Sequence, residues 1–128
     1  MAPPEPARPC VLVADDDPLI RMVLRAALEG DGYEVREAQT GEAAVMAVAT
    51  ADLALAILDV HMPGPGFDRT LRDLRSRRIP VLVLSGDAAV TAGQSTEQLA
   101  YLGKPVSVDD LLASVTSLIS ASKALPGE

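Results

Sequence analysis

Short runs of apolar residues alternate along the chain with segments whose apolar residues recur at helical spacing. The runs, and one alternating segment at 33–37, predict strands, because a parallel sheet covered on both faces has nearly continuous apolar strands. The segments between them predict helices that are long enough for right-handed crossovers between parallel strands. Strands are predicted at 11–14, 33–37, 53–58, 79–84 and 99–102, and helices at about 18–28, 41–49, 67–77 and 107–119.

The limits of the first helix follow from local chemistry. Asp17 suits the N-cap, and Pro18 suits the first helical position, where its missing N–H costs nothing. Gly30 or Gly32 is expected to end the helix. Its buried stripe is predicted to consist of Ile20, Val23, Leu24, Ala27 and Leu28.

Two later segments differ in how clearly they can be assigned. Ser107 and Asp110 form a capping box at the start of the last helix. Residues 87–97 are small and polar, with Gly93 inside a weak helical pattern, so a fourth helix there would be short, displaced or partly disordered.

Composition agrees with one helix-covered sheet. The chain has 128 residues, of which 48% are apolar and only 2% aromatic, so one aliphatic core is expected. We predict a flexible arm at 1–9, a domain at 10–121 and a tail at 122–128.

The charge and the cysteine content narrow the class of protein. A formal charge of −7 without a basic stripe argues against nucleic-acid binding, and the arginines at 72–78 are interpreted as a solvated helix face. Cys10 is the single cysteine, and no apolar run is long enough to span a bilayer, so a reducing, cytoplasmic setting is expected.

Polar residues that can bind a metal ion or a phosphoryl group follow four of the predicted strands. Asp15 and Asp16 follow the first strand, Asp59 the third, Ser85 the fourth and Lys104 the fifth. The carboxyl ends of parallel strands meet at one edge of the sheet, which is where open α/β sheets bind ligands. The sequence therefore predicts one site that contains all of these residues.

The three carboxylates at this edge call for a cation. Two unit charges ~4 Å apart repel by about 4 kcal/mol at a surface-like dielectric constant. Mg²⁺ prefers such hard oxygen ligands, and Lys104 adds a point charge that can hold a phosphoryl oxygen. These features indicate phosphoryl transfer to a carboxylate, which depends mainly on positioning and charge neutralisation. Asp59 stands alone and is the expected nucleophile, with Asp15 and Asp16 as metal ligands.

Three segments in order resemble the receiver domains of bacterial two-component response regulators. They are Val-Leu-Val-Ala-Asp-Asp-Asp-Pro-Leu-Ile-Arg at 11–21, Ile-Leu-Asp-Val-His-Met-Pro-Gly at 57–64 and Gly-Lys-Pro at 103–105. Ser85 ends a strand between the last two segments, and the resemblance covers roughly residues 10–120. It implies a stand-alone, CheY-like α/β fold, with a doubly wound five-stranded parallel sheet in the flavodoxin-like order 2-1-3-4-5.

The resemblance also implies a role for each matching residue. Asp59 would be the phosphoacceptor, and Asp15, Asp16, Asp59 and the backbone carbonyl of His61 would bind Mg²⁺. In the same way, phosphoryl binding and switching would fall to Ser85, Lys104 and Tyr101. Dephosphorylation would be tuned by His61 and Asp87. The resemblance also implies a cis peptide bond before Pro105.

The resemblance further implies partners. A sensor histidine kinase or a histidine phosphotransferase would donate the phosphoryl group, and the chain would be a signalling switch rather than an enzyme. Without an output domain, the signal would pass by contact with a downstream protein, or the chain would serve as a phosphate sink. A weak dimer through the fourth helix, fifth strand and fifth helix is a further expectation.

Two alternatives remain open at this stage. In a haloacid-dehalogenase-type phosphatase, Asp15 would be the nucleophile and Asp17 the acid, with Asp109 and Asp110 completing the motif set. In a flavodoxin-like cofactor binder, the turn after the first strand would hold an anionic flavin. The position of Asp17 before a proline argues against the first, and the acidic turn argues against the second.

Overall fold

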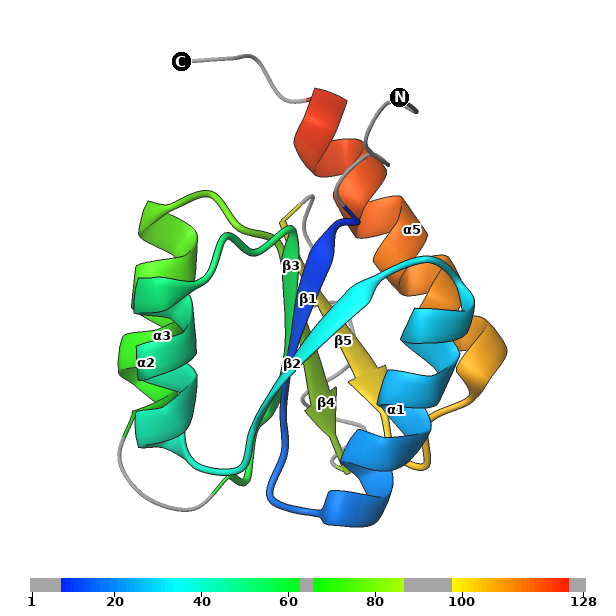
Figure 1. The fold of residues 1–128 in the computed structure, drawn as a ribbon, viewed down its shortest axis with the longest axis horizontal. Helices are drawn as coiled ribbons and strands as arrows, with labels where there is room; N and C mark the ends of the chain where they lie inside the picture. Colours follow the sequence, from blue (N-terminus) through cyan, green and yellow to red (C-terminus); the bar gives the residue numbers. More distant parts are fainter. Residues whose placement is uncertain (1–7, 63–65, 87–97, 125–128) are drawn as a thin grey trace, which may run out of the picture.

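A computed structural model describes residues 8–62, 66–86 and 98–124. Five parallel strands form one sheet in the order β2-β1-β3-β4-β5, as predicted (Figure 1). The strands are β1 (Cys10–Ala14), β2 (Glu34–Ala38), β3 (Leu55–Asp59), β4 (Val81–Ser85) and β5 (Leu99–Gly103). The helices are α1 (Pro18–Gly30), α2 (Gly41–Thr50), α3 (Phe67–Ser76) and α5 (Val108–Ala124).

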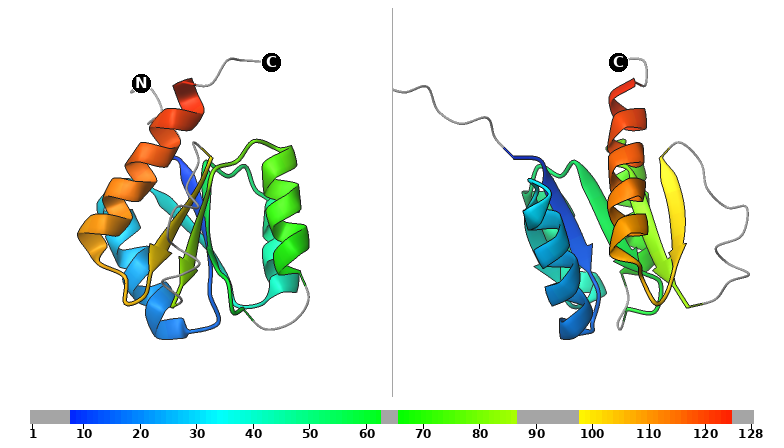
Figure 2. Two further views of the ribbon diagram at one scale, coloured as in Figure 1. Left: turned by 180° about the vertical axis from the view of Figure 1, so that it is seen from behind. Right: turned by 90° about the vertical axis from the view of Figure 1, so that its right-hand side faces the viewer.

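The helices cover both faces of the sheet. Figures 1 and 2 show α2 and α3 side by side on one face, with α1 and α5 on the other. Alternate strand residues supply two cores: Val11 and Val13 pack toward α1 and α5, whereas Leu12 and Ala14 pack toward α2 and α3. Because both faces are covered, β1, β3 and β4 are buried almost throughout.

Both predicted N-caps are present, and of the predicted capping box the structure shows the hydrogen bond that Ser107 accepts. The Asp17 carboxylate accepts the Leu19 N–H at 2.9 Å and so caps α1, and the Ser107 hydroxyl accepts the Asp110 N–H at 3.4 Å at the start of α5. Helix α1 ends at Gly30, with Asp31 as its C-cap, and Gly32 takes the positive φ of 94° that the turn into β2 requires.

Glycine is required where α2 and α3 begin. Gly66 has φ 128°, and a Cβ atom built on it would lie 2.7 Å from the Gly41 carbonyl carbon. A side chain at residue 66 would therefore collide with the backbone of α2, so the close approach of the two helix starts depends on this glycine.

Several element boundaries differ from the prediction. Strands β3 and β4 begin two positions later than the apolar runs, because Leu53 and Ile79 pack into the core as part of the preceding connections. Each of these strands also extends one residue further than predicted, so β3 includes Asp59 and β4 includes Ser85. Helix α5 continues to Ala124, past residue 121, at which the domain was predicted to end.

One residue of the predicted stripe of α1 is exposed. Val23 is 44% exposed, whereas Leu24 and Leu28 are almost fully buried. Val23 lies at an apolar groove of about 220 Å³ between α1 and the connection from β5 to α5, and this groove explains its exposure.

Two further expectations concern other parts of the chain. The prediction about a short or disordered fourth helix falls on residues 87–97, which lie outside the described residues. In the part of the chain that the structure describes, no helix is both long enough and apolar enough to cross a membrane.

Candidate functional site

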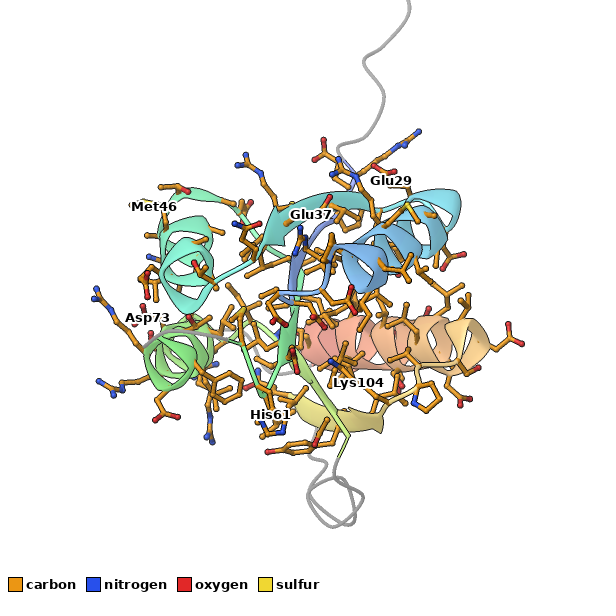
Figure 3. The ribbon with its side chains drawn as sticks, turned by 90° about the horizontal axis from the view of Figure 1, so that it is seen from below. Glu29, Glu37, Met46, His61, Asp73 and Lys104 are labelled. Carbon is orange, nitrogen blue, oxygen red and sulfur yellow. The ribbon has the colours of Figure 1, made fainter. Side chains whose placement is uncertain are left out.

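The predicted site residues gather at the carboxyl edge of the sheet, which faces the viewer in Figure 3. Asp15 follows β1, Asp59 ends β3, Ser85 ends β4 and Lys104 follows β5. Strand register produces this arrangement: Asp59 pairs with Leu84, and Ser85 pairs with Gly103, immediately before Lys104. Residues far apart in the sequence therefore meet on one rim.

The two buried aspartates are each held by their own turn. Asp15 has no exposed surface and Asp59 has 3%. The Asp17 N–H donates to Asp15 Oδ1 at 2.9 Å, and the His61 N–H donates to Asp59 Oδ1 at 3.2 Å. In both cases the backbone amide two residues further on fixes the carboxylate, so the turns position these side chains.

Lys104 connects the two carboxylates. Its Nζ lies 3.3 Å from Asp15 Oδ2 and 3.2 Å from Asp59 Oδ1. The Lys104 N–H also donates to the Ser85 carbonyl at 2.9 Å, and the peptide between Lys104 and Pro105 is cis, as the resemblance implied. Lys104 is thus tied to β4 by its backbone while its ammonium group reaches β1 and β3.

Burial and charge act on the ionisation of this site. Burial raises the pKa of Asp15, and the neighbouring Asp59 raises it further, against the opposing effects of the Asp17 N–H and Lys104. Burial alone would lower the pKa of Lys104, but Asp15 and Asp59 together hold it above its ordinary value. The site therefore favours a charged lysine.

The carboxylates of Asp15, Asp16 and Asp59 form a cluster that fits Mg²⁺. One oxygen from each lies within 4.8 Å of the others, close to the ~4.2 Å between oxygens on opposite sides of one Mg²⁺ ion. Asp16 is exposed, so the cluster opens to solvent and leaves room for the waters that Mg²⁺ retains. Lys104 is a single positive charge beside three acids, so a cation would relieve their repulsion.

The remaining predicted residues lie around this cluster. Ser85 is buried, with 1% exposure. Tyr101 is half-buried, pairs with Val83 and packs against the core on the side of α2 and α3. Val83 and Ser85 are two residues apart on β4 and so face the same side of the sheet as Tyr101. Asp87 lies outside the described residues.

His61 contributes to the site through its backbone. Its side chain is exposed, whereas its N–H holds Asp59 as described above. Figure 3 places His61 beside the strand ends, on the same rim as Lys104. Its carbonyl remains a predicted metal ligand.

Sequence reasoning missed one contact with the turn that carries Asp15 and Asp16. Arg21 Nη1 donates to the backbone carbonyl of Asp15 at 2.7 Å, and Arg21 Nε donates to Glu37 Oε1 at 2.9 Å. The sequence offered two signals: an arginine in the first turns of α1, where arginine is also common on solvated helix faces, and its place at the end of the 11–21 segment that carries the resemblance. The contact with Glu37 depends on the pairing of β1 with β2, which brings the end of β2 beside α1.

The structure does not favour the phosphatase alternative. The Asp17 carboxylate is engaged as the cap of α1, so it is not available as an acid beside Asp15. Asp109 and Asp110 are exposed in the first turn of α5 and do not belong to the carboxylate cluster.

Comparisons with known proteins agree with this geometry. A family model described as the response regulator receiver domain matches residues 11–116. The transcriptional regulatory protein KdpE of the KDP operon from Escherichia coli is 39% identical over 80% of this chain and 48% of its own length. PdtaR of Mycobacterium tuberculosis is 36% identical over 92% of this chain and 62% of its own length.

Solved structures give the same result. The receiver domain of the hybrid histidine kinase CckA is 32% identical with a TM-score of 0.68, and the match covers 85% of this chain and 98% of that one. The receiver domain of the Francisella response regulator 1452 is 29% identical with a TM-score of 0.76, over 88% and 98% of the two chains. This chain spans less than two thirds of the curated relatives named above, so the likeness concerns the domain. The chain belongs to the response regulator receiver domain family of two-component signalling.

Proposed function

We propose that this chain is a phosphorelay receiver that takes a phosphoryl group onto Asp59. The observation that supports this most directly is the position of Asp59. Its carboxylate ends the central strand β3, lies 3.2 Å from Lys104 Nζ and belongs to the cluster with Asp15 and Asp16. A nucleophile, a counter-charge and candidate metal ligands are thereby within reach of one another.

The contacts of the two buried aspartates favour Asp59 over Asp15 as the nucleophile. Both oxygens of Asp15 have partners, since Oδ1 accepts the Asp17 N–H and Oδ2 pairs with Lys104. Among the described residues, the contacts of Asp59 all fall on Oδ1. Oδ2 of Asp59 is therefore the oxygen that remains for attack on phosphorus.

The reaction is a transfer of the phosphoryl group from nitrogen to oxygen. A lone pair of Asp59 Oδ2 forms a bond to the phosphorus of a phosphohistidine, the phosphorus–nitrogen bond breaks, and the leaving imidazole nitrogen keeps the bonding electrons and takes a proton. The product is an acyl phosphate on Asp59, which water later cleaves. Mg²⁺ bound by Asp15, Asp16, Asp59 and the His61 carbonyl would neutralise charge on the transferring oxygens.

Lys104 and Ser85 are placed to bind the new anion. Lys104 Nζ lies 3.2 Å from Asp59 Oδ1, so an oxygen of a phosphoryl group on Asp59 could replace this carboxylate oxygen as its partner. Ser85 ends the neighbouring strand, and its movement toward the phosphoryl group would change the space available to Tyr101 on the same sheet face. His61, exposed at the rim, and Asp87 would tune the access of water.

We assign the donor to a histidine kinase or a histidine phosphotransferase, and the readout to contact with a downstream protein. The family membership supports a donor of this class. A cytoplasmic setting is part of the same proposal. A weak dimer through β5, α5 and the segment before β5 would be one form of readout.

The test is direct phosphorylation by a small donor. Wild type and Asp59→Asn are incubated with acetyl phosphate or phosphoramidate and Mg²⁺, and the intact proteins are weighed by mass spectrometry. Wild type is expected to gain one phosphoryl group that water removes on standing, whereas Asp59→Asn gains none. Asp17→Asn is the matched control, because it changes a nearby carboxylate that only caps α1. A phosphoryl group on Asp59→Asn, mapped to Asp15, would overturn the proposal.

A further inference from the structure

We propose that Arg21 is a positioning residue that fixes the peptide between Asp15 and Asp16 and so holds the carboxylate cluster in the shape that binds Mg²⁺. This inference rests on the proposed function. Arg21 lies on α1, outside the set of residues that the chemistry of phosphoryl transfer requires.

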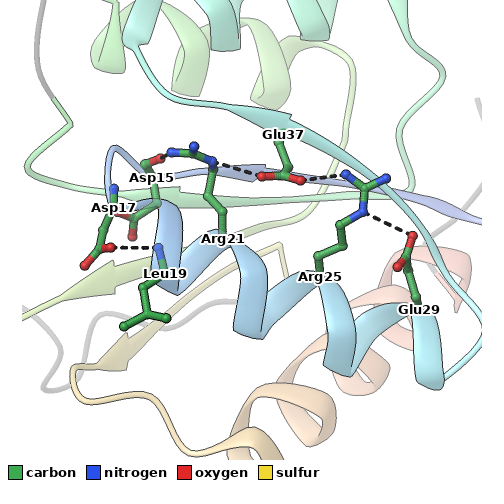
Figure 4. A network of polar contacts seen from close by, with 7 residues as sticks. All are labelled: Asp15, Asp17, Leu19, Arg21, Arg25, Glu29 and Glu37. Carbon is green, nitrogen blue, oxygen red and sulfur yellow. Dashed lines mark hydrogen bonds and ion pairs between the residues drawn. The ribbon is translucent and has the colours of Figure 1, made fainter.

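The contacts of Arg21 are made by two arms of its guanidinium group (Figure 4). Nη1 donates to the Asp15 carbonyl at 2.7 Å, and Nε donates to Glu37 Oε1 at 2.9 Å. The side chain of Arg21 is only 14% exposed, although it carries a charge. A planar guanidinium with both arms engaged has few orientations left, so it can hold the carbonyl in one direction.

Glu37 is itself anchored. Its Oε2 accepts Arg25 Nη1 at 2.6 Å, and Arg25 Nε lies 3.2 Å from a carboxylate oxygen of Glu29 (Figure 4). Arg25, with help from Arg21, holds the pKa of Glu37 below its ordinary value, so Glu37 is ionised at neutral pH. Arg21 is therefore fixed between α1 and the end of β2.

The neighbouring backbone adds a third attachment to the same turn. The Asp15 N–H donates to the carbonyl of Ala38, the residue after Glu37 on β2, at 3.0 Å. The turn that carries the two aspartates is thereby attached to β2 on one side of Asp15 and, through Arg21, on the other.

The position of Asp16 depends on this arrangement. The carbonyl that Arg21 holds belongs to the peptide joining Asp15 to Asp16, and that peptide is planar, so fixing its oxygen also fixes the direction in which the chain enters Asp16. Asp16 is exposed and has no hydrogen-bond or ion-pair partner among the residues that the structure describes. Its backbone therefore sets the position from which its carboxylate reaches the cluster.

Charge and positioning predict opposite effects for the loss of Arg21. A cation removed from beside an acidic cluster should strengthen Mg²⁺ binding by Coulomb interaction alone. Loss of the hydrogen bond from Arg21 to the Asp15 carbonyl should loosen the turn at Asp15 and Asp16 and weaken Mg²⁺ binding, because partners that orient metal ligands contribute to metal affinity. The sign of the change in affinity therefore separates the two effects.

The experiment compares Arg21→Met with Arg25→Met. Arg25 lies one turn further along α1 and shares Glu37 as a partner, but it does not contact Asp15, so its replacement removes the same charge and leaves the Asp15 carbonyl bonded. Isothermal titration calorimetry measures Mg²⁺ affinity of the unphosphorylated proteins without a phosphodonor. Amide hydrogen exchange at residues 16 and 17 in metal-free buffer reports on the turn itself.

Arg21→Met is expected to bind Mg²⁺ about tenfold more weakly, the lower end of the range for partners that orient metal ligands. Its amides at 16 and 17 should exchange faster, whereas Arg25→Met should resemble wild type in both measurements. Arg21→Lys keeps the positive charge but donates from a single nitrogen, so it should recover part of the Mg²⁺ affinity. Phosphorylation of Arg21→Met by acetyl phosphate should be slow at low Mg²⁺ and approach the wild-type rate when Mg²⁺ saturates.

Equal or tighter Mg²⁺ binding by Arg21→Met, with unchanged exchange at 16 and 17, would overturn the positioning role while the proposed function stands. Wild-type protein that neither binds Mg²⁺ nor accepts a phosphoryl group would overturn the proposed function itself. If Arg21→Met fails to fold by circular dichroism, Glu37→Gln provides the same test by weakening the anchor of Arg21. It is expected to lose affinity in the same direction, to a smaller extent, and unchanged affinity would count against the role.

Discussion

Replacement of Lys104 by methionine tests how strongly the two buried carboxylates depend on their counter-charge. The ammonium group lies 3.3 Å from Asp15 Oδ2 and 3.2 Å from Asp59 Oδ1, and the two carboxylates are almost fully buried. Methionine keeps most of the apolar stem that lines the groove beside α1, so the change mainly removes charge.

The expected loss follows from these distances. Each pair at ~3.2 Å has a Coulomb energy of about 5 kcal/mol at an effective dielectric constant of about 20, much of which offsets the cost of desolvating the charges. Removing one partner of a buried ion pair costs about 3–5 kcal/mol. Lys104 is 25% exposed and the rim admits water. We therefore expect a loss in the free energy of unfolding of about 3 kcal/mol, at the low end of that range.

This loss is measured by urea unfolding in a metal-free buffer with a chelator, with circular dichroism as the signal. Added Mg²⁺ should restore more stability to Lys104→Met than it adds to wild type, because the ion supplies the missing positive charge. Arg72→Met removes an exposed cation from α3 and controls for the change in net charge.

Coupling to Asp15 gives a second readout. Lys104→Met combined with Asp15→Asn should lose less stability than the sum of the single changes, because the single lysine change leaves Asp15 buried and unpaired. A Lys104→Met protein as stable as wild type without metal, or additive single changes, would refute the view that Lys104 balances these carboxylates.

Two further predictions concern stability away from the site. Thr70 lies fully buried in α3, and its Oγ1 has no partner among the described residues, so Thr70→Val should leave the free energy of unfolding unchanged or raise it by about 1 kcal/mol. A clear loss in urea unfolding would show that this hydroxyl is bonded. The pKa of Glu37 is lowered by folding, so its contribution is present above its unfolded pKa and is lost as pH falls through the lower folded value. Glu37→Gln should accordingly flatten the acid limb of stability against pH, and an unchanged slope would contradict the ion-pair network.

Local patterns in the sequence were sufficient for the elements and for most of the site. Apolar runs and helical periodicity predicted the strands and helices, and Asp17 as a cap was correct because capping depends only on neighbouring residues. The starts of β3 and β4 were less certain, since Leu53 and Ile79 pack against the core from the preceding connections, and apolar character alone does not distinguish connections from strands.

Contacts between distant segments were decided only by the tertiary structure. Lys104 and Asp15 are 89 residues apart, and only the strand order and register bring the ammonium group between two carboxylates. Arg21 meets Glu37 because β2 lies beside α1, a relation that no local pattern encodes. The sequence by itself determined which chemical groups reach the rim, because strand ends are local features. The sheet decided which of those groups touch, because hydrogen-bond register between strands is a property of the whole fold.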